Sequence, residues 1–361
     1  MSGGDDTTST KDTNLAYRLQ ASILTNSPEC VLERLHIHLL EHDVDSHLSS
    51  GSLVVELAAV SGILRLIDGG IEVDVFAADL ETLYFVKVWL EDALADEPAA
   101  RTARIEWSKS CLQRHLPPSF CVLTVDSTTD IAPRLRRIRF RTADTRSFDT
   151  LDDIHLRILF NFQEIAERHG SSESQQQVPS SDIKPIWRAY TVRFVDPANH
   201  TIAVDFVMHD DEGPGSSWAR RAARGDVVGA AGPSGGGFND AQWYLLAGDE
   251  TALPAISRIL ESLDETKTAT VIIEVGTSAD TISFTSRAAV DTKWLYRDAS
   301  EASCRPGLAQ AIAHVDIPHI SLKRFAWVAC EAKAAKAIRA TLRDRGFAKE
   351  EQSVAAYWHT M

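Results

Sequence analysis

Residues 188–220 combine side chains that could hold a dinucleotide. Arg188 offers a planar fork to a pair of pyrophosphate oxygens, and Tyr190 offers a flat face to a ring system. Thr191, on the opposite side of the same strand, offers a hydroxyl to a ring nitrogen. Taken alone, the three are better explained as ordinary sheet residues. With the glycine-rich segment that follows, they favour a flavin dinucleotide.

A second strand in this stretch ends at His209 and leads to a glycine-rich helix start. The first backbone N–H groups of a helix have no partner within it, so they can bind an anion. Ser216 could instead cap the helix, and both interpretations use the same N–H groups. The residues expected to form this phosphate cradle are Gly213, Ser216 and Ser217, with Trp218 as a packing residue.

Three blocks in order resemble the siderophore-interacting protein family of flavin-dependent ferric reductases. They are Arg188-Ala189-Tyr190-Thr191 continuing to Gly213-Pro214-Gly215-Ser216-Ser217-Trp218-Ala219, then residues 244–256, then Trp327 to Glu331 with Tyr357-Trp358. The resemblance covers about residues 117–361. It implies an FAD-dependent oxidoreductase that reduces ferric siderophore complexes with electrons from NAD(P)H.

The resemblance also assigns roles to residues. It implies that Arg188 binds the pyrophosphate, Tyr190 packs on the flavin, and Thr191 bonds near the hydride-accepting nitrogen. His209 would contact the cofactor. The turn after the next buried strand would face the nicotinamide, at the carboxyl edge of a parallel sheet. That turn consists of Gly248, Asp249, Glu250 and Thr251, and a plain strand–helix turn is the alternative.

Two further expectations concern the electron donor and the substrate. Residues 277–283 follow a strand that would face the adenosine ribose, and they hold no Arg or Lys, which favours NADH over NADPH. The family often has a lysine in the third barrel strand, where this chain has Arg157. Arg157 and Lys184 are therefore the candidates for siderophore binding. The arginines of residues 135–141 are either a solvated face or a local attraction for an anionic ferric complex.

The chain departs from the family pattern near its end. Cys330 stands where glycine is usual, and His359-Thr360-Met361 lacks the basic and glycine residues that often follow Trp358. These departures concern cofactor access near the C-terminus.

Two other functions stay open, because the fold does not fix the electron acceptor. One is a flavin reductase of the same fold that passes electrons to a protein partner. The other is a non-enzymatic module that binds siderophores or iron. A ferredoxin-like protein is a further candidate electron donor.

The hydrophobic patterning predicts a multi-domain α+β and α/β protein. We expect a disordered tail over residues 1–14 and a small α+β domain over 15–105, with helices at 15–24 and 30–42. This segment faintly resembles a domain of unassigned function found beside siderophore-interacting proteins. After a connector, residues 117–236 predict an antiparallel, ferredoxin-reductase-type FAD-binding barrel. Residues 237–361 predict a nicotinamide-binding domain with a parallel sheet.

Composition limits the class of protein. The net charge of −14 argues against nucleic-acid or anionic-membrane binding. No apolar run approaches the ~20 residues of a membrane-spanning helix, and no signal peptide is evident. Five cysteines without a Cys-x-x-Cys pair argue against an iron–sulfur cluster and favour the cytoplasm. Four histidines, His36, His38, His42 and His47, are best explained by a polar helix face, so no metal site is expected.

Overall fold

The computed structural model describes residues 15–41, 44–57, 59–96, 103–108, 116–169, 183–209, 213–298, 307–318 and 322–359. They form two compact units, one ending at Pro118 and the other beginning at Ser119. The predicted tail over residues 1–14 and His42 lie outside the described residues. Among the helices of these ranges, none is both long and apolar enough to cross a membrane.

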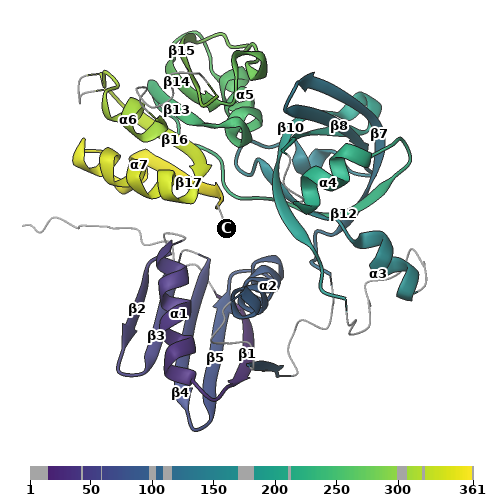
Figure 1. Cartoon of the computed structure of the whole chain (residues 1–361), viewed down its shortest axis with the longest axis vertical. Helices are drawn as coiled ribbons and strands as arrows, with labels where there is room; N and C mark the ends of the chain where they lie inside the picture. Colours follow the sequence, from purple (N-terminus) through teal and green to yellow (C-terminus); the bar gives the residue numbers. More distant parts are fainter. Residues whose placement is uncertain are drawn as a thin grey trace, which may run out of the picture. The chain divides into compact units, whose positions relative to one another are not determined.

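The N-terminal unit is a six-stranded antiparallel sheet in the order β2-β3-β4-β5-β1-β6. Two helices, α1 (Pro28–Glu41) and α2 (Leu80–Asp96), share one hydrophobic core with one face of the sheet (Figure 1). The strands are β1 Tyr17–Leu24, β2 Ser46–Ser49, β3 Ser52–Leu57, β4 Val60–Ile67, β5 Gly70–Ala77 and β6 Arg104–Trp107. The predicted small α+β fold is thereby confirmed.

Two local predictions in this unit are wrong. Residues 15–24 were expected to be helical but include strand β1, in which Leu19, Ala21 and Ile23 are buried in alternation. Leu15, Leu19 and Ile23 also fit helical spacing, and pairing of β1 with β5 and β6 decides between the two. Residues 98–116 were expected to be a connector but include strand β6, so the N-terminal sheet extends beyond residue 105.

The second unit begins with a closed barrel in the order β10-β11-β8-β7-β12-β9. Its strands are β7 Cys121–Ala132, β8 Leu135–Arg141, β9 His155–Leu159, β10 Trp187–Asp196, β11 Thr201–Val207 and β12 Val227–Ser234. Helix α3 (Phe162–His169) follows β9, and α4 (Pro214–Arg221) follows β11. The alternating apolar side chains of the strands meet in one core, to which α4 contributes Ala219. The predicted antiparallel barrel is confirmed.

A five-stranded parallel sheet completes the second unit, in the order β15-β14-β13-β16-β17. The strands are β13 Trp243–Asp249, β14 Thr268–Val275, β15 Ala289–Tyr296, β16 Arg324–Glu331 and β17 Gln352–Trp358. Helix α5 (Leu253–Ser262) packs on one face, and α6 (Leu308–Ala313) and α7 (Ala332–Asp344) pack on the other. The first strand, β13, lies in the centre, so the chain leaves it in both directions. Ligands bind at such a switch point, outside the carboxyl ends of the strands.

Candidate cofactor-binding site

The side chains of strand β10 point alternately into two different environments. Tyr190 packs among aromatic rings, with centroids 4.5 Å from Phe206 and 5.9 Å from Phe160. Thr191 faces the other way and is 4% exposed. The strand therefore offers an aromatic ring on one side and a hydroxyl on the other.

Helix α4 begins next to Tyr190 without a side-chain cap. Its N-cap residue, Gly213, makes no capping hydrogen bond, so the first N–H groups of the helix face outward. A Cβ added at Gly215 would overlap the Tyr190 hydroxyl, so only glycine permits this approach. Arg188 lies two residues before Tyr190, hence on the same strand face, and its Nη1 donates to the Trp187 carbonyl at 2.7 Å. A guanidinium beside an uncapped helix start suits a pyrophosphate.

The residues around His209 fix the end of strand β11. The Ser216 hydroxyl accepts from the His209 N–H at 3.3 Å and donates to the His209 carbonyl at 3.2 Å. Arg220 also donates to that carbonyl, at 2.8 Å. Ser217 donates its N–H to the Gly213 carbonyl at 3.0 Å, within the helix. Ser216 thus anchors the loop, and the backbone N–H groups are what the helix start offers an anion.

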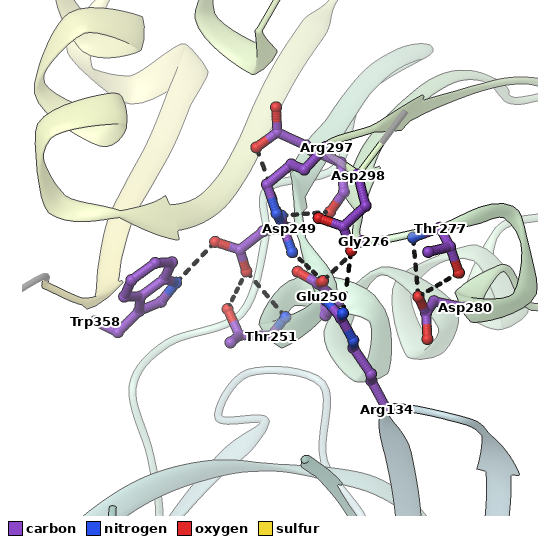
Figure 2. Close-up of polar contacts among 11 residues, drawn as sticks. Arg134, Asp249, Glu250, Thr251, Gly276, Thr277, Asp280, Arg297, Asp298 and Trp358 are labelled. Carbon is purple, nitrogen blue, oxygen red and sulfur yellow. Dashed lines mark hydrogen bonds and ion pairs between the residues drawn. The ribbon is translucent and has the colours of Figure 1, made fainter. Parts of the chain in front are cut away.

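The turn after β13 is held by its own side chains (Figure 2). One carboxylate oxygen of Asp249 accepts two hydrogen bonds from Thr251, from the backbone N–H at 2.9 Å and from the hydroxyl at 2.5 Å. The other oxygen of Asp249 accepts the indole N–H of Trp358 at 2.8 Å. Gly248 packs against the Ala329 carbonyl, where a Cβ would clash. These contacts join the tip of β17 to the turn predicted to face the nicotinamide.

Charged side chains surround the ends of β14 and β15. The buried Glu250 accepts the Gly276 N–H at 3.1 Å and pairs with Arg297 (Figure 2). Arg297 also lies 3.6 Å from Glu274. Arg134, from the hairpin between β7 and β8, packs on Gly276 and pairs with Asp298 at 3.0 Å. Residues 277–283 contain no Arg or Lys, but Arg134 and Arg297 reach the same edge from other segments of the chain.

Two family models match this unit. The model of the siderophore-interacting FAD-binding domain covers residues 124–237, and that of the siderophore-interacting protein covers residues 241–361. This part of the chain belongs to the siderophore-interacting protein family. The predicted resemblance is therefore confirmed.

Named relatives of this siderophore-interacting unit agree with the family models. Ferric vibriobactin reductase ViuB of Vibrio cholerae serotype O1 is 35% identical over 178 residues, which are 48% of this chain and 65% of ViuB. The ferric acinetobactin reductase of Acinetobacter baumannii is 28% identical over 179 residues, 48% of this chain and 61% of that protein. The chain thus spans less than two thirds of the length of these relatives.

Solved structures show the same fold. A siderophore utilization protein from T. fusca superposes with a TM-score of 0.55 and 28% identity, covering 66% of this chain and 92% of that one. The siderophore-interacting protein SipS from Aeromonas hydrophila gives a TM-score of 0.55 at 22% identity, with 67% and 92% covered. The barrel followed by a parallel sheet is the architecture that they share with this unit.

The two residues predicted to bind the siderophore, Arg157 and Lys184, lie in different parts of the barrel domain. Arg157 on β9 lies opposite Ala189 of β10, and His155 lies opposite Thr191. Arg157 and Thr191 therefore share the outward face of the barrel, one strand spacing apart. Lys184 precedes the start of β10, and its carbonyl accepts the Asn161 amide at 2.9 Å. Arg157 is thus the better placed of the two.

The arginines of β8 each contact a carboxylate. Arg137 pairs with Asp205 at 2.7 Å, and Arg141 pairs with Asp126 at 2.8 Å. Arg139 lies 3.7 Å from Asp196 and over the Phe194 ring. Since these charges are compensated locally, the row is an ion-paired surface, which leaves little field to attract an anionic complex.

The C-terminal departures and the histidines have local explanations. Cys330 is buried, and burial raises the pKa of its thiol to about 12, so it stays protonated. Glu331 caps α7 by accepting the N–H of Lys333 at 2.7 Å. His36 contacts the Ser46 hydroxyl at 3.0 Å. Across the described ranges, no group of three or more His, Cys, Asp or Glu side chains could hold a metal ion.

Sequence reasoning missed three residues of the site. His155 lies opposite Thr191 and contacts Tyr357, and Arg258 from α5 donates to the carbonyl of Val192, the residue after Thr191. They are far apart in the chain, so no local motif joins them. Two signals were available: Tyr357 belongs to the Tyr357-Trp358 block that resembles the family, and the period-two alternation of β9 places His155 on the face of Arg157.

Proposed function

We propose that this protein is an FAD-dependent oxidoreductase that reduces iron(III) in siderophore complexes with electrons from NADH and releases iron(II). The barrel would bind FAD and the parallel-sheet domain would bind the nicotinamide. One NADH reduces two ferric complexes, giving NAD⁺, two iron(II) and one proton. Because hard oxygen ligands hold iron(III) far better than iron(II), reduction frees the metal.

The observation that carries the proposal is the approach of Tyr190 to Gly215 at the uncapped start of α4. It brings an aromatic ring to the free N–H groups of the helix start, and Arg188 lies on the same strand face as Tyr190; a flavin dinucleotide requires these three kinds of group. Arg188 and the N–H groups of α4 would hold the pyrophosphate, with Tyr190 packed against the flavin and His209 beside it. FAD, when bound, supplies the transfer of a hydride and of single electrons.

The turn from Gly248 to Thr251 would receive the nicotinamide. It lies at the carboxyl end of the central strand, where parallel sheets bind ligands. Asp249 is fixed there by Thr251 and Trp358, so the backbone of the turn is held rigid before a ligand arrives. A preorganised turn loses less freedom on binding, which favours affinity.

The charges at this edge support NADH over NADPH. Arg134 and Arg297 are each paired already, and the carboxylates of Glu250, Glu274 and Asp298 surround them. A 2′-phosphate would have to approach this excess of negative charge, whereas ribose hydroxyls can donate to a carboxylate. The local field thus opposes the phosphorylated donor.

Arg157 would bind the siderophore. Its guanidinium shares the barrel face of Thr191, so an anionic ferric complex held there would lie next to the flavin ring. Transfer of single electrons needs the complex to lie close to the ring, and a cation beside the ring would hold it there.

We place the protein in the cytoplasm, supported by the free thiols of Cys30, Cys121 and Cys330.

A steady-state assay tests the proposal. The FAD-loaded protein is mixed anaerobically with NADH, a ferric siderophore and an iron(II) chelator. We expect NADH loss and iron(II) in a 1:2 ratio, and no reaction with the iron-free siderophore. NADH oxidation by quinone or protein acceptors but not by ferric complexes would contradict it. Replacing NADH with reduced ferredoxin shows whether a ferredoxin-like protein donates instead.

A further inference from the structure

An arginine of the barrel lies against the edge of the parallel sheet where the adenosine ribose of the donor is expected (Figure 2). Arg134 belongs to the turn between β7 and β8, and its carbonyl accepts the Met208 N–H at 2.8 Å. Its guanidinium reaches past the end of β14, where a Cβ built on Gly276 would lie 2.3 Å from the Nη1 atom. Glycine at this position therefore leaves the space that the guanidinium fills.

The carboxylate that holds this guanidinium follows the neighbouring strand, β15. The backbone N–H of Asp298 donates to the Gly276 carbonyl at 3.0 Å, which fixes Asp298 beside the same glycine. The Oδ2 atom of Asp298 accepts from Nη2 of Arg134 at 3.0 Å, and its Oδ1 atom makes no hydrogen bond within the described ranges. The two side chains are 46% and 47% exposed, so water weakens their attraction and a ligand can reach both.

The second arginine at this edge is held more firmly. Arg297 pairs with the buried Glu250, and its Nη1 atom lies 3.6 Å from Glu274. Glu250 is fixed in turn by the Gly276 N–H, which it accepts at 3.1 Å. Because two carboxylates hold this one guanidinium, Arg297 has little capacity left for a ligand. Arg134 is therefore the arginine of this edge that can respond to the donor.

Another carboxylate adds negative charge beside Gly276. Asp280 is 3% exposed, and its Oδ2 atom accepts both the N–H and the hydroxyl of Thr277 at 2.9 Å. A Cβ built on Gly276 would lie 3.1 Å from this oxygen, and the other oxygen, Oδ1, has no hydrogen-bond partner in the part of the chain that the structure describes. A 2′-phosphate at this edge would thus meet the carboxylates of Asp280 and Asp298 while the charge of Arg134 is already engaged.

In dinucleotide-binding sheets, a carboxylate at this edge accepts the ribose 2′-hydroxyl of NADH, whereas an arginine accommodates the 2′-phosphate of NADPH. This chain supplies both groups as one ion pair. We propose, resting on the function proposed above, that Arg134 and Asp298 determine the choice of donor. Asp298 accepts the 2′-hydroxyl through Oδ1 and, by engaging Arg134 through Oδ2, withholds the cation that a 2′-phosphate needs. The specificity residue thus comes from the barrel and not from residues 277–283.

The test compares two nucleotides that differ only in the 2′-phosphate, 5′-AMP and adenosine 2′,5′-bisphosphate. Their Kd values for the full-length, FAD-loaded protein are measured by titration calorimetry, which needs no electron transfer. We expect the wild type to bind 5′-AMP more tightly. In Asp298→Asn, the bisphosphate should bind about tenfold more tightly than in the wild type, the effect of one charge-assisted hydrogen bond. Combining Asp298→Asn with Arg134→Gln should abolish this gain.

A matched control separates this ion pair from a general change of charge. Asp291→Asn removes one negative charge from an exposed position of the same strand, β15, and should leave both Kd values unchanged. Thermal unfolding checks that each variant is folded. No gain in Asp298→Asn, an equal gain in Asp291→Asn, or a gain that persists after Arg134→Gln would overturn the proposal. A wild type that binds 5′-AMP but reduces no ferric siderophore would contradict the proposed function alone.

Discussion

Arg258 donates a hydrogen bond of 2.7 Å to the carbonyl oxygen of Val192, the residue after Thr191 on β10. The same guanidinium donates to the carbonyls of Phe148 at 3.0 Å and Thr150 at 2.5 Å, while only 8% of Arg258 is exposed. Arg258 belongs to α5, so one buried side chain ties the parallel-sheet half to the strand of the candidate flavin site. The ion pair of Arg193 with Glu261, at 2.5 Å, reinforces this junction.

Removing the hydrogen bonds of Arg258, which join α5 to the barrel, should destabilise the protein. Arg258→Met keeps the apolar stem but leaves three buried carbonyls without their donors, so we expect the free energy of unfolding to fall by roughly 2–4 kcal/mol. Urea unfolding measures the change. Arg287→Met is the matched control, because Arg287 is 70% exposed and lies 3.6 Å from the equally exposed Glu265. Equal stability of the two variants would show that the hydrogen bonds of Arg258 do not stabilise the contact between α5 and the barrel.

Arg188→Ala should weaken FAD binding without unfolding the barrel. Loss of a charge-assisted hydrogen bond of about 1.5–3 kcal/mol corresponds to roughly a 10- to 100-fold higher Kd. Quenching of flavin fluorescence gives the Kd directly. Arg141→Ala removes a more distant barrel arginine, which pairs with Asp126, and should leave the Kd unchanged. The same Kd in both variants would remove Arg188 from the site.

Gly215→Ala tests the helix start independently of charge. The new Cβ would overlap the Tyr190 hydroxyl, so either Tyr190 or the first turn of α4 must move. We expect loss of tightly bound FAD, seen as colourless purified protein, with the barrel still folded. Gly225→Ala is unsuitable as a control because Gly225 has a φ of +97°. Gly62→Ala is suitable, because only ordinary contact with Val75 results. A yellow Gly215→Ala protein would argue against the cradle.

The choice of donor should respond to charge at the sheet edge. We expect a higher kcat/KM for NADH than for NADPH. Glu274→Gln removes one negative charge beside Arg297, and the preference should shift toward NADPH by about fivefold, or ~1 kcal/mol. Glu265→Gln, on the exposed surface, serves as the control. An unaltered ratio in Glu274→Gln would show that this carboxylate does not face the ribose.

His155 should make stability depend on pH in mildly acidic solution. Its folded-state pKa of about 4 lies below the ordinary 6.5, so the unfolded chain binds the proton first as the pH falls. Stability is therefore complete above pH 6.5 and is lost as the pH falls toward 4, by up to about 3 kcal/mol. Urea unfolding of the wild type and His155→Gln at several pH values isolates this contribution. Parallel pH curves for the two proteins would contradict it.

Patterns within single segments predicted most of the second unit. The alternation along β8 and the buried run of β13 each indicated a strand, because side-chain period and burial are local properties. In β1, by contrast, helical and strand spacing coincide, and only pairing with β5 decides. The motif residues Arg188, Tyr190 and Gly215 were found because they share one short stretch of sequence.

Patterns within single segments could not predict contacts between residues that are far apart in the sequence. Tyr357 lies 202 residues after His155, and Arg297, which follows β15, reaches Glu250, which follows β13. Closure of the barrel and the order of the sheet create these contacts, and no spacing in the sequence records them. The composition of residues 277–283 could not indicate that Arg134, from the hairpin between β7 and β8, reaches the same edge of the sheet.

The position of the cofactor can be observed directly in a crystal structure of the full chain grown with excess FAD. We expect the pyrophosphate to be bound by Arg188 and the first N–H groups of α4. We also expect the flavin ring between Tyr190 and the sheet, with its hydride-accepting nitrogen within hydrogen-bonding distance of Thr191. A crevice filled by the protein's own side chains, or FAD bound elsewhere, would contradict it.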